Sequence, residues 1–326
     1  MMDRTNLLLS LVIPIYKVEQ YIEKCLSSIY VQIDDLPVEV VLVNDGTPDK
    51  SMDIAQKFVN NRTVIVAQEN QGLSVARNNG IAASHGKYVW CVDSDDWIAS
   101  DKIKDVCDWI KMYSKCEVLV IGIKAFDEDG HTIPSFHPRQ PVSDVTIKSG
   151  AKWILTPNFE RGPMQIFIIS RDFILRKQLY YIPGLLHEDM DYAPRMLIDA
   201  ENVAYIPEDV YCYLIRSNGS ITSTVNPKRF SDLFSILSSH ESLTASLAKN
   251  SDQYKAMCAS QWMLLRSLIS YLKIQRYEGP DLFKKKNAKL VRKIALRSLG
   301  CKMKFTYKIK FFLTYLYPKI YKFIRW

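Results

Sequence analysis

The chain has 326 residues, of which 48% are hydrophobic and 24% charged, values typical of a globular protein with one large or two ordinary domains. Its 7 cysteines are odd in number and never form a Cys-x-x-Cys pair, which argues against a disulfide framework or a thiolate zinc site and favours the reducing cytosol. The net charge of +8 is uneven, because residues 271–326 carry 16 Lys and Arg against 2 acidic residues, whereas the remainder carries 27 against 33. We therefore expect the C-terminal region to meet a different partner from the rest of the chain.

Strand and helix patterns alternate through the first 125 residues. Short apolar runs indicate strands, and apolar residues at a spacing of three or four indicate helices. The predicted strands are 8–15, 38–43, 63–67, 88–92 and 117–123, and the predicted helices are 18–30, 51–59, 74–83 and 101–113. This order predicts a mostly parallel sheet with helices on both faces.

The order is less regular after a turn at 128–130. Between residues 151 and 215 the patterns predict helices at 151–155, 172–178 and 191–198, and strands at 166–169, 203–206 and 211–214. From Pro227 the pattern is helical almost to the end. We place a boundary near residue 225, which separates a region 1–225 from a helical, basic region 226–326.

Polar side chains follow three of the predicted parallel strands at their carboxyl ends, where ligands bind in open parallel sheets. Pro14 and Tyr16 close the first strand, Asp45 follows the second, and the fourth ends in the acids Asp93, Asp95 and Asp96. Clustered carboxylates repel one another, so a positive partner is expected, and a divalent metal that carries a phosphate-bearing substrate is the simplest. Alternatively, Asp45 is a turn residue, and Asp95 or Asp96 caps the helix near Asp101.

The segment 69–80 is a second signal. Gly72 allows a tight loop, Ser74 is a plausible N-cap, and Arg77 lies one turn into the helix, where it would face an anion such as a pyrophosphate. The alternative is an ordinary surface helix whose arginine is solvated.

Two further positions suggest chemistry. Glu188 and Asp189 are adjacent carboxylates after an apolar stretch, which suggests a general base, although acidic residues also favour the first turn of a helix. Arg216 follows an apolar strand and precedes a glycine-containing loop, where it is either a phosphate clamp or a surface charge.

Together these segments strongly resemble the family 2 glycosyltransferases of GT-A fold, especially the bacterial polysaccharide-synthesis branch. The matching strings occur in the family's order at 12–16, 42–47, 72–80, 92–97, 187–189 and 216–220. The resemblance implies an α/β fold of GT-A, Rossmann-like type, with a mostly parallel central sheet flanked by helices and a C-terminal helical region. Region 1–225 would be the catalytic domain, with nucleotide-sugar binding in 1–125 and the acceptor and base in 126–225.

The resemblance also implies an activity. A metal-dependent hexosyltransferase would move a sugar, with inversion, from a nucleotide-diphosphate sugar, by resemblance a UDP-sugar, to a saccharide or lipid-linked saccharide in cell-surface polysaccharide synthesis. Mn²⁺ or Mg²⁺ would neutralise charge on the leaving diphosphate.

By the same resemblance, each candidate site residue takes a role. The uracil-type base of the nucleotide would contact Pro14, Tyr16 and Asp45, and Arg77 would lie beside the nucleotide. Ribose and metal would meet Asp93 and Asp95, with Asp96 as an adjacent candidate ligand, and which of the three binds the metal directly stays open. Asp189 would be the catalytic base beside Glu188, and the diphosphate would meet Arg216 and Ser220.

Two segments depart from the family's pattern. Asn44 stands where the family often has aspartate, although the matched Asp45 is kept. Residues 161–165 match no family pattern, and acceptor contacts usually lie there, so the acceptor stays open.

The segment 302–326 interleaves aromatic, aliphatic and basic residues and contains no acid. This composition favours a helix on an anionic membrane surface, which would place the protein on the inner face of the cell membrane. A helical subdomain packed on the catalytic domain, or a nucleic-acid patch, would give a similar composition.

Three other functions are weighed. A nucleotidyltransferase would also place acids on a metal, but no glycine-rich phosphate loop with a lysine lies near the N-terminus. A dehydrogenase would need Gly-x-Gly-x-x-Gly after the first strand, where Pro14 and Tyr16 stand instead. A catalytically inactive, membrane-associated binding protein that keeps the fold remains the non-enzyme alternative.

Overall fold

The computed structural model describes residues 6–134, 142–159, 163–216, 226–274 and 285–299. The chain divides into two compact units, residues 1–220 and residues 221–326. The predicted boundary at 225 falls outside the described residues, so its position stays a prediction.

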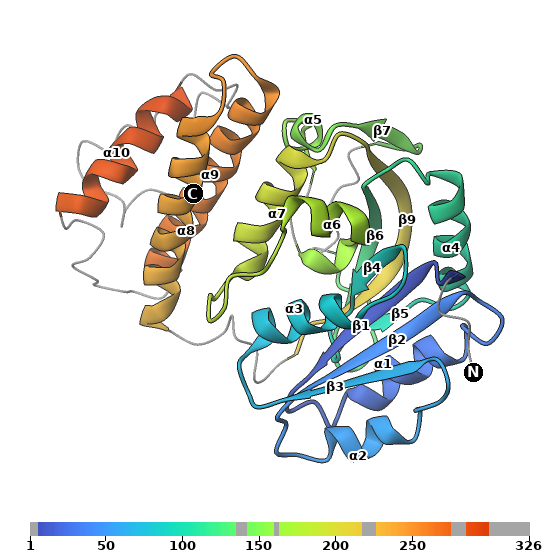
Figure 1. Ribbon diagram of the computed structural model, residues 1–326. Coiled ribbons are helices and arrows are strands. Elements are labelled where there is room, and N and C mark those ends of the chain that lie inside the picture. Colours follow the sequence, from blue (N-terminus) through green and yellow to red (C-terminus); the bar gives the residue numbers. More distant parts are fainter. Residues whose placement is uncertain (1–5, 135–141, 160–162, 217–225, 275–284, 300–326) are drawn as a thin grey trace. The chain divides into compact units, whose positions relative to one another are not determined.

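The first unit is built on one nine-stranded sheet with the order β3-β2-β1-β4-β8-β6-β9-β5, and β7 pairs with β9 (Figure 1). The strands are β1 Leu9–Ile15, β2 Val38–Asp45, β3 Thr63–Gln68, β4 Tyr88–Cys91, β5 Trp97–Ile98, β6 Val118–Phe126, β7 Thr146–Lys148, β8 Phe167–Ser170 and β9 Val203–Leu214. The helices are α1 Ile22–Tyr30, α2 Ser51–Gln56, α3 Leu73–Ala83, α4 Lys102–Met112, α5 Gly150–Ile154, α6 Arg171–Lys177 and α7 Glu188–Asp199, with a 3₁₀ turn η3 at Met164–Ile166.

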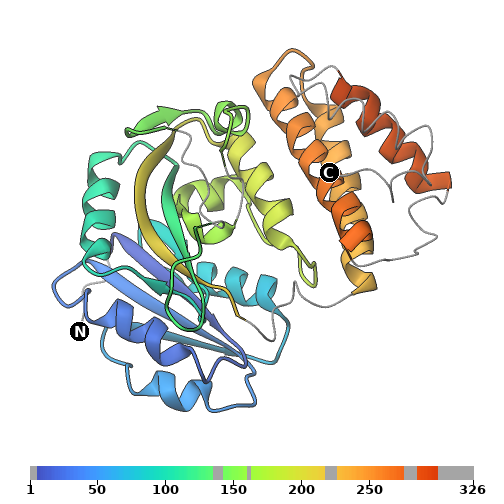
Figure 2. The same cartoon turned by 180° about the vertical axis from the view of Figure 1, so that it is seen from behind.

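The sheet is parallel through β3, β2, β1 and β4, and β6 is parallel to β9. Antiparallel pairs are confined to β8 against β4 and β6, and to β5 and β7 against β9. Right-handed crossovers from β1 to β2 to β3 and then back to β4 place α1 and α2 on one face and α3 on the other (Figures 1 and 2). The predicted α/β class and central sheet flanked by helices are confirmed.

Buried apolar residues explain the order of layers. Every residue of β1 is buried, as expected for a central strand covered on both faces. The helix α3 lies so close to the sheet at Gly80 that a Cβ at this position would overlap the side chain of Val12. This close approach brings Arg77, one turn earlier on α3, to the sheet edge.

Some predicted boundaries were wrong. The helix predicted from Ser74 begins at Leu73, and its N-cap is Gly72 with a φ of +85°, a conformation that favours glycine. The two strands predicted at 203–206 and 211–214 form one strand, β9. Pro207 cannot donate a ladder hydrogen bond, and it lies where the register against β6 shifts around Gly122, so a bulge accommodates the proline.

The second unit contains three described helices, α8 Pro227–Ser246, α9 Asp252–Ile274 and α10 Lys285–Leu299. The Asn226 side chain caps α8 by accepting a hydrogen bond from the Lys228 amide at 3.0 Å. Glu241 of α8 forms ion pairs with Arg297 and Lys293 of α10, each at 2.7 Å. Among the described helices, none combines the length and the apolar character that a membrane crossing would require. Residues 302–326 lie outside the described part.

Candidate functional site

The first part of the candidate site lies where β1 and β2 end. The register pairs Ile15 with Asn44, so Tyr16 and Asp45 follow side by side. Pro14 is buried within β1, whereas Tyr16 is 40% exposed. An exposed ring at the carboxyl end of a parallel strand can stack against a planar ligand.

The Asp45 carboxylate is buried and holds the loop between β3 and α3. One oxygen accepts from the Gln71 amide at 2.8 Å and the Gln68 side chain at 2.7 Å. The other accepts from the Gly72 amide at 2.9 Å and the Asn70 side chain at 3.2 Å. Asp45 therefore fixes the loop that leads into α3, in addition to being a turn residue.

The second part is the acidic group formed by Asp93, Asp95 and Asp96 just after β4, whose ligand oxygens lie within 4.8 Å of one another. Asp96 is 1% exposed and accepts hydrogen bonds from the Tyr211 hydroxyl at 2.7 Å and the Leu214 amide at 2.8 Å. Burial and the neighbouring charges of Asp95 and Asp93 raise the pKa of Asp96 well above its usual value. Neither Asp95 nor Asp96 caps the following helix, because Asp101 occupies the N-cap position.

Asp93 and Asp95 have different partners. Asp93 receives one hydrogen bond from the Arg77 guanidinium at 2.7 Å and another from the Gln165 side chain. Asp95 pairs with Arg216 at 2.8 Å, and its side chain is 18% exposed. Burial, followed by the charge of Asp93, raises the pKa of Asp95, although Arg216 opposes the shift. Additional positive charge near Asp95 would therefore stabilise its ionised form.

Arg77 is buried, so the alternative of a solvated surface arginine is wrong. Its guanidinium donates to Asp93 at 2.7 Å and to Glu188 at 2.6 Å, and it lies 5.4 Å from the ring centre of Tyr181. Two carboxylates on different elements thus share one arginine fork, which suits bidentate contacts. Arg77 links the acidic group at the sheet edge to the start of α7.

The start of α7 carries the third part. His187, with a φ of +61°, is the N-cap, and Glu188 and Asp189 form the first turn. Burial raises the pKa of Asp189 to about 6, with a further contribution from the charge of Glu188. A carboxyl group with a pKa near the working pH is suited to general base catalysis.

Arg216 borders an open cavity of about 410 Å³ beside the acidic group. Its guanidinium lies 5.2 Å from the ring centre of Tyr21, another residue of the cavity wall. The wall is completed by Lys17, Glu19, Gln20, Pro48 and Asp49.

The structure therefore brings most of the predicted residues to one edge of the sheet. Arg216 contacts Asp95. Arg77 contacts both Asp93 and Glu188, and Asp189 follows Glu188 in α7. Pro14, Tyr16 and Asp45 lie at the ends of β1 and β2, and Asp45 also holds the loop that precedes α3. Ser220 lies outside the described residues.

Sequence reasoning missed two residues of the site. The apolar pattern at 211–214 predicts Tyr211 only as a strand residue, yet its hydroxyl donates to Asp96 and accepts from the Asp93 amide at 3.0 Å. Gln165 lies in the segment that matched no family pattern. A lone glutamine between the apolar Met164 and Ile166 was the available signal for a buried polar role.

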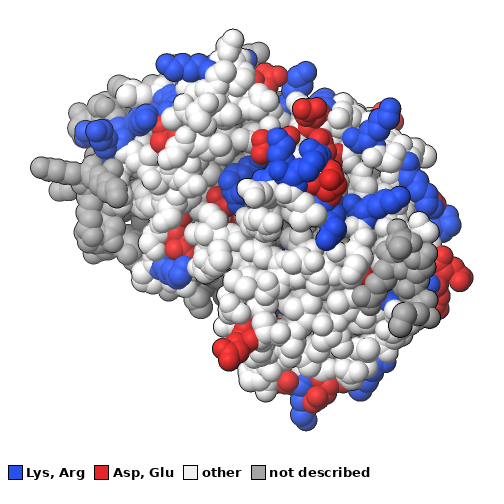
Figure 3. Space-filling view, viewed as in Figure 1, with Lys and Arg blue, Asp and Glu red and all other residues white. Residues whose placement is uncertain are grey.

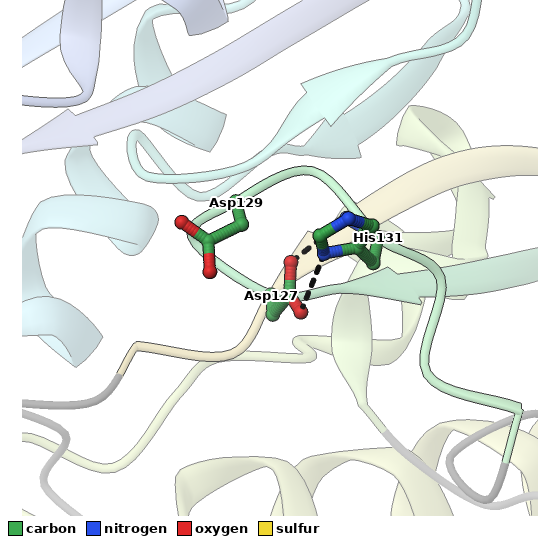
Figure 4. Close-up of side chains that lie close together, drawn as sticks. All are labelled: Asp127, Asp129 and His131. Carbon is green, nitrogen blue, oxygen red and sulfur yellow. Dashed lines mark hydrogen bonds and ion pairs between the residues drawn. The ribbon is translucent and has the colours of Figure 1, made fainter.

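The acidic group suits a hard divalent cation, because Mg²⁺ and Mn²⁺ prefer carboxylate oxygens. A second group, Asp127, Asp129 and His131, lies in the turn after β6 (Figure 4). There Asp127 already accepts from the His131 amide at 2.8 Å and contacts the His131 ring at 3.3 Å. These contacts close the turn between Asp127 and His131 without a ligand.

The family model described as "Glycosyl transferase family 2" matches residues 10–179. The glycosyltransferase GlyA of Streptococcus pneumoniae is 29% identical over 262 residues, covering 76% of this chain and 36% of that protein. The putative glycosyltransferase EpsH of Bacillus subtilis is 29% identical over 235 residues, covering 68% and 64%. The chain spans between 36% and 64% of the length of these two relatives and of the next two.

A third relative has a solved crystal structure. The Staphylococcus aureus poly(ribitol-phosphate) beta-N-acetylglucosaminyltransferase TarS is 27% identical over 238 residues, covering 70% of this chain and 39% of that protein. The crystal structure of TarS 1–349 in complex with UDP-GlcNAc aligns with a TM-score of 0.63 at 20% identity, covering 89% of this chain and 81% of that one. At this identity the likeness shows the fold.

Proposed function

The chain belongs to glycosyl transferase family 2, and from that premise we propose that it moves a sugar from a UDP-sugar to a hydroxyl group of a saccharide or lipid-linked saccharide in cell-surface polysaccharide synthesis. The observation that carries the proposal is that Arg77 joins Asp93, a member of the acidic group, to Glu188 through two ion pairs. These ion pairs link an acidic group that would hold a cation to Glu188, the neighbour of Asp189, a carboxyl with a pKa of about 6.

We assign direct metal binding chiefly to Asp95. The Asp93 oxygens already accept from Arg77 and Gln165, and those of Asp96 from Tyr211 and Leu214. A divalent cation there would offset charge that grows on the leaving diphosphate. Asp93 would face the ribose from its fixed orientation.

The ends of β1 and β2 would hold the base of the nucleotide. The exposed ring of Tyr16 would stack on the uracil, with buried Pro14 behind it. Asp45 is the candidate acceptor for the ring N–H, but contact requires the side-chain amide of Gln68 or Asn70 to give way, because both Asp45 oxygens already have two donors. The backbone amides of the loop would stay in place.

The transfer itself would use Asp189 as the base. Its carboxylate would take the proton of the acceptor hydroxyl as that oxygen attacks the far face of the sugar, so the anomeric configuration inverts. Arg77 would keep Glu188, and with it the first turn of α7, in place. Arg216, with Ser220, would contact the diphosphate after Arg216 leaves Asp95.

The decisive experiment measures nucleotide release from UDP-, GDP- and dTDP-sugars with and without Mn²⁺. We expect UDP release that depends on the cation and on an acceptor. Release of pyrophosphate from a nucleoside triphosphate and a sugar 1-phosphate, assayed in parallel, would instead indicate a nucleotidyltransferase, and UDP binding without release would indicate an inactive relative.

Asp95→Ala tests the metal assignment by calorimetry of UDP in Mn²⁺. We expect the cation-dependent part of UDP affinity to be lost, whereas Asp127→Ala, which alters the acidic turn outside the site, should bind as wild type. Unchanged binding by the Asp95 variant would remove the acidic group from the proposal.

We also propose that residues 302–326, which lie outside the described part, attach the protein to an anionic membrane surface. The composition of this segment alone supports the proposal. Sedimentation with vesicles should show binding to anionic but not zwitterionic lipid, weakened by salt. Equal binding to both would contradict an electrostatic attachment.

A further inference from the structure

Gln165 is held at both its main chain and its side chain by the strand end that carries the acids. It lies in η3, just before β8, and is 5% exposed. Its main-chain oxygen accepts from the indole of Trp90 at 2.7 Å, and Trp90 is a fully buried residue of β4. The backbone of Gln165 is thus fixed to the strand that leads into Asp93.

The side-chain amide of Gln165 donates to one carboxylate oxygen of Asp93, and Arg77 donates to the other at 2.7 Å. With one donor on each oxygen, the plane of the carboxylate is determined. The orientation of the amide is determined too, because turning it over would bring its carbonyl oxygen against the carboxylate. Gln165 therefore acts on Asp93 as a directed donor.

The oxygen of the Gln165 side-chain amide is in a less favourable environment than the nitrogen. This oxygen is buried and has no hydrogen-bond partner within the described parts of the chain. A buried acceptor without a donor costs stability, so an apolar side chain of similar shape would suit the fold better at this position. The glutamine is explained by what its nitrogen does for Asp93.

We propose that Gln165 is a positioning residue of the nucleotide-sugar site, which orients the Asp93 carboxylate toward the ribose and the metal-bearing face beside Asp95. This role rests on the proposed function. By taking one Asp93 oxygen, Gln165 also leaves the second arm of the Arg77 fork free to hold Glu188. The same contact therefore serves the donor side and the base side of the site.

The test compares UDP binding in Mn²⁺ by calorimetry for wild type, Gln165→Met, Asp93→Asn and the double variant. Methionine keeps the length of the side chain but cannot donate. We expect Gln165→Met to bind UDP about tenfold more weakly, the order expected for a hydrogen bond to a charged group. In the Asp93→Asn background the same change should have little effect, because the two residues act through one contact.

Thermal unfolding separates positioning from packing. We expect Gln165→Met to unfold near the wild-type temperature, because removal of the unpartnered oxygen offsets the loss of the hydrogen bond to Asp93, whose side chain is 23% exposed to water. Gln165→Asn, which keeps the amide but withdraws it from Asp93, should show the same loss of UDP affinity and serves if the methionine variant does not fold.

The outcomes are distinguishable. Wild-type UDP affinity in either folded variant, or an equal loss in the Asp93→Asn background, would overturn the role of Gln165 and leave the proposed function standing. Failure of wild type to bind UDP would overturn both.

Discussion

The Asp45 carboxylate at the end of β2 has different surroundings from the carboxyl groups that follow β4 and begin α7. Asp45 has four hydrogen-bond donors, two of them backbone amides of the loop that it holds. Asp95, Asp96 and Asp189 are crowded by burial and by other acids, and each has a raised pKa. Asp45 thus holds the loop, whereas the ionised forms of Asp95, Asp96 and Asp189 are disfavoured and would be stabilised by an incoming cation.

The largest expected effect comes from Asp189→Asn, which keeps the shape of the side chain but removes the base. Transfer should fall by about 10²–10⁴-fold, the usual contribution of general base catalysis. UDP affinity should stay at the wild-type value, because Asp189 is not assigned to the nucleotide.

Steady-state transfer and calorimetry measure these two quantities. Asp199→Asn, at the other end of α7, is the control and should transfer normally. Normal turnover by the Asp189 variant would move the base elsewhere.

The pH profile gives the next effect. With a pKa of about 6, Asp189 is ionised above that pH, so transfer should fall toward about a tenth of its plateau by pH 5. Glu188→Gln removes a neighbouring negative charge that raises this pKa, so the acidic limb of the profile should move to lower pH. An acidic limb at the same pH in both proteins would show that another group titrates.

The comparison between Asp45 and Asp95 also predicts opposite effects on stability. In Asp45→Asn either orientation of the amide places an NH₂ group against a backbone amide, of Gln71 or of Gly72. The free energy of unfolding should fall by about 1–3 kcal/mol. Chemical denaturation at pH 7 measures it.

Asp95→Asn should instead raise the unfolding free energy at pH 7. Its pKa is raised in the folded state, so ionised Asp95 opposes folding above that pKa, and the penalty disappears below the unfolded-state value. The gain should therefore shrink as the pH is lowered. Destabilisation by Asp95→Asn as large as that by Asp45→Asn would erase the distinction between the two regions.

The sequence was sufficient for the parts of this site that depend on strand ends. Alternating strand and helix patterns predicted that Asp45 and the acids after β4 share one edge, because parallel strands bring their carboxyl ends together. The helix α7 was predicted only from residue 191, and it begins at Glu188, so the alternative that Glu188 and Asp189 form an acidic first turn is confirmed. These features depend on local pattern and on the topology that follows from it.

Contacts between distant elements could not be predicted in this way. Arg77 has the appearance of a solvated helix residue until α7, more than a hundred residues later, supplies Glu188. Tyr211 is indistinguishable from an apolar strand residue until β9 passes Asp96. Gln165 has no local signal beyond its polarity, because the carboxylate it orients, Asp93, follows β4 and lies far away in the sequence.

The smallest expected effect concerns Arg216, which pairs with Asp95 and is only 23% exposed. If it moves to the diphosphate, as proposed, it exchanges one anionic partner for another, so its net contribution to binding is the difference between two similar contacts. Arg216→Gln should therefore weaken UDP by about twofold to fivefold, as for a partly exposed ion pair. Uridine, which has no phosphate, should bind the variant as it binds wild type. An equal loss of affinity for uridine and for UDP would mean that Arg216 contacts the nucleotide base or supports the structure of the site. The proposed exchange of Asp95 for the diphosphate would then be wrong.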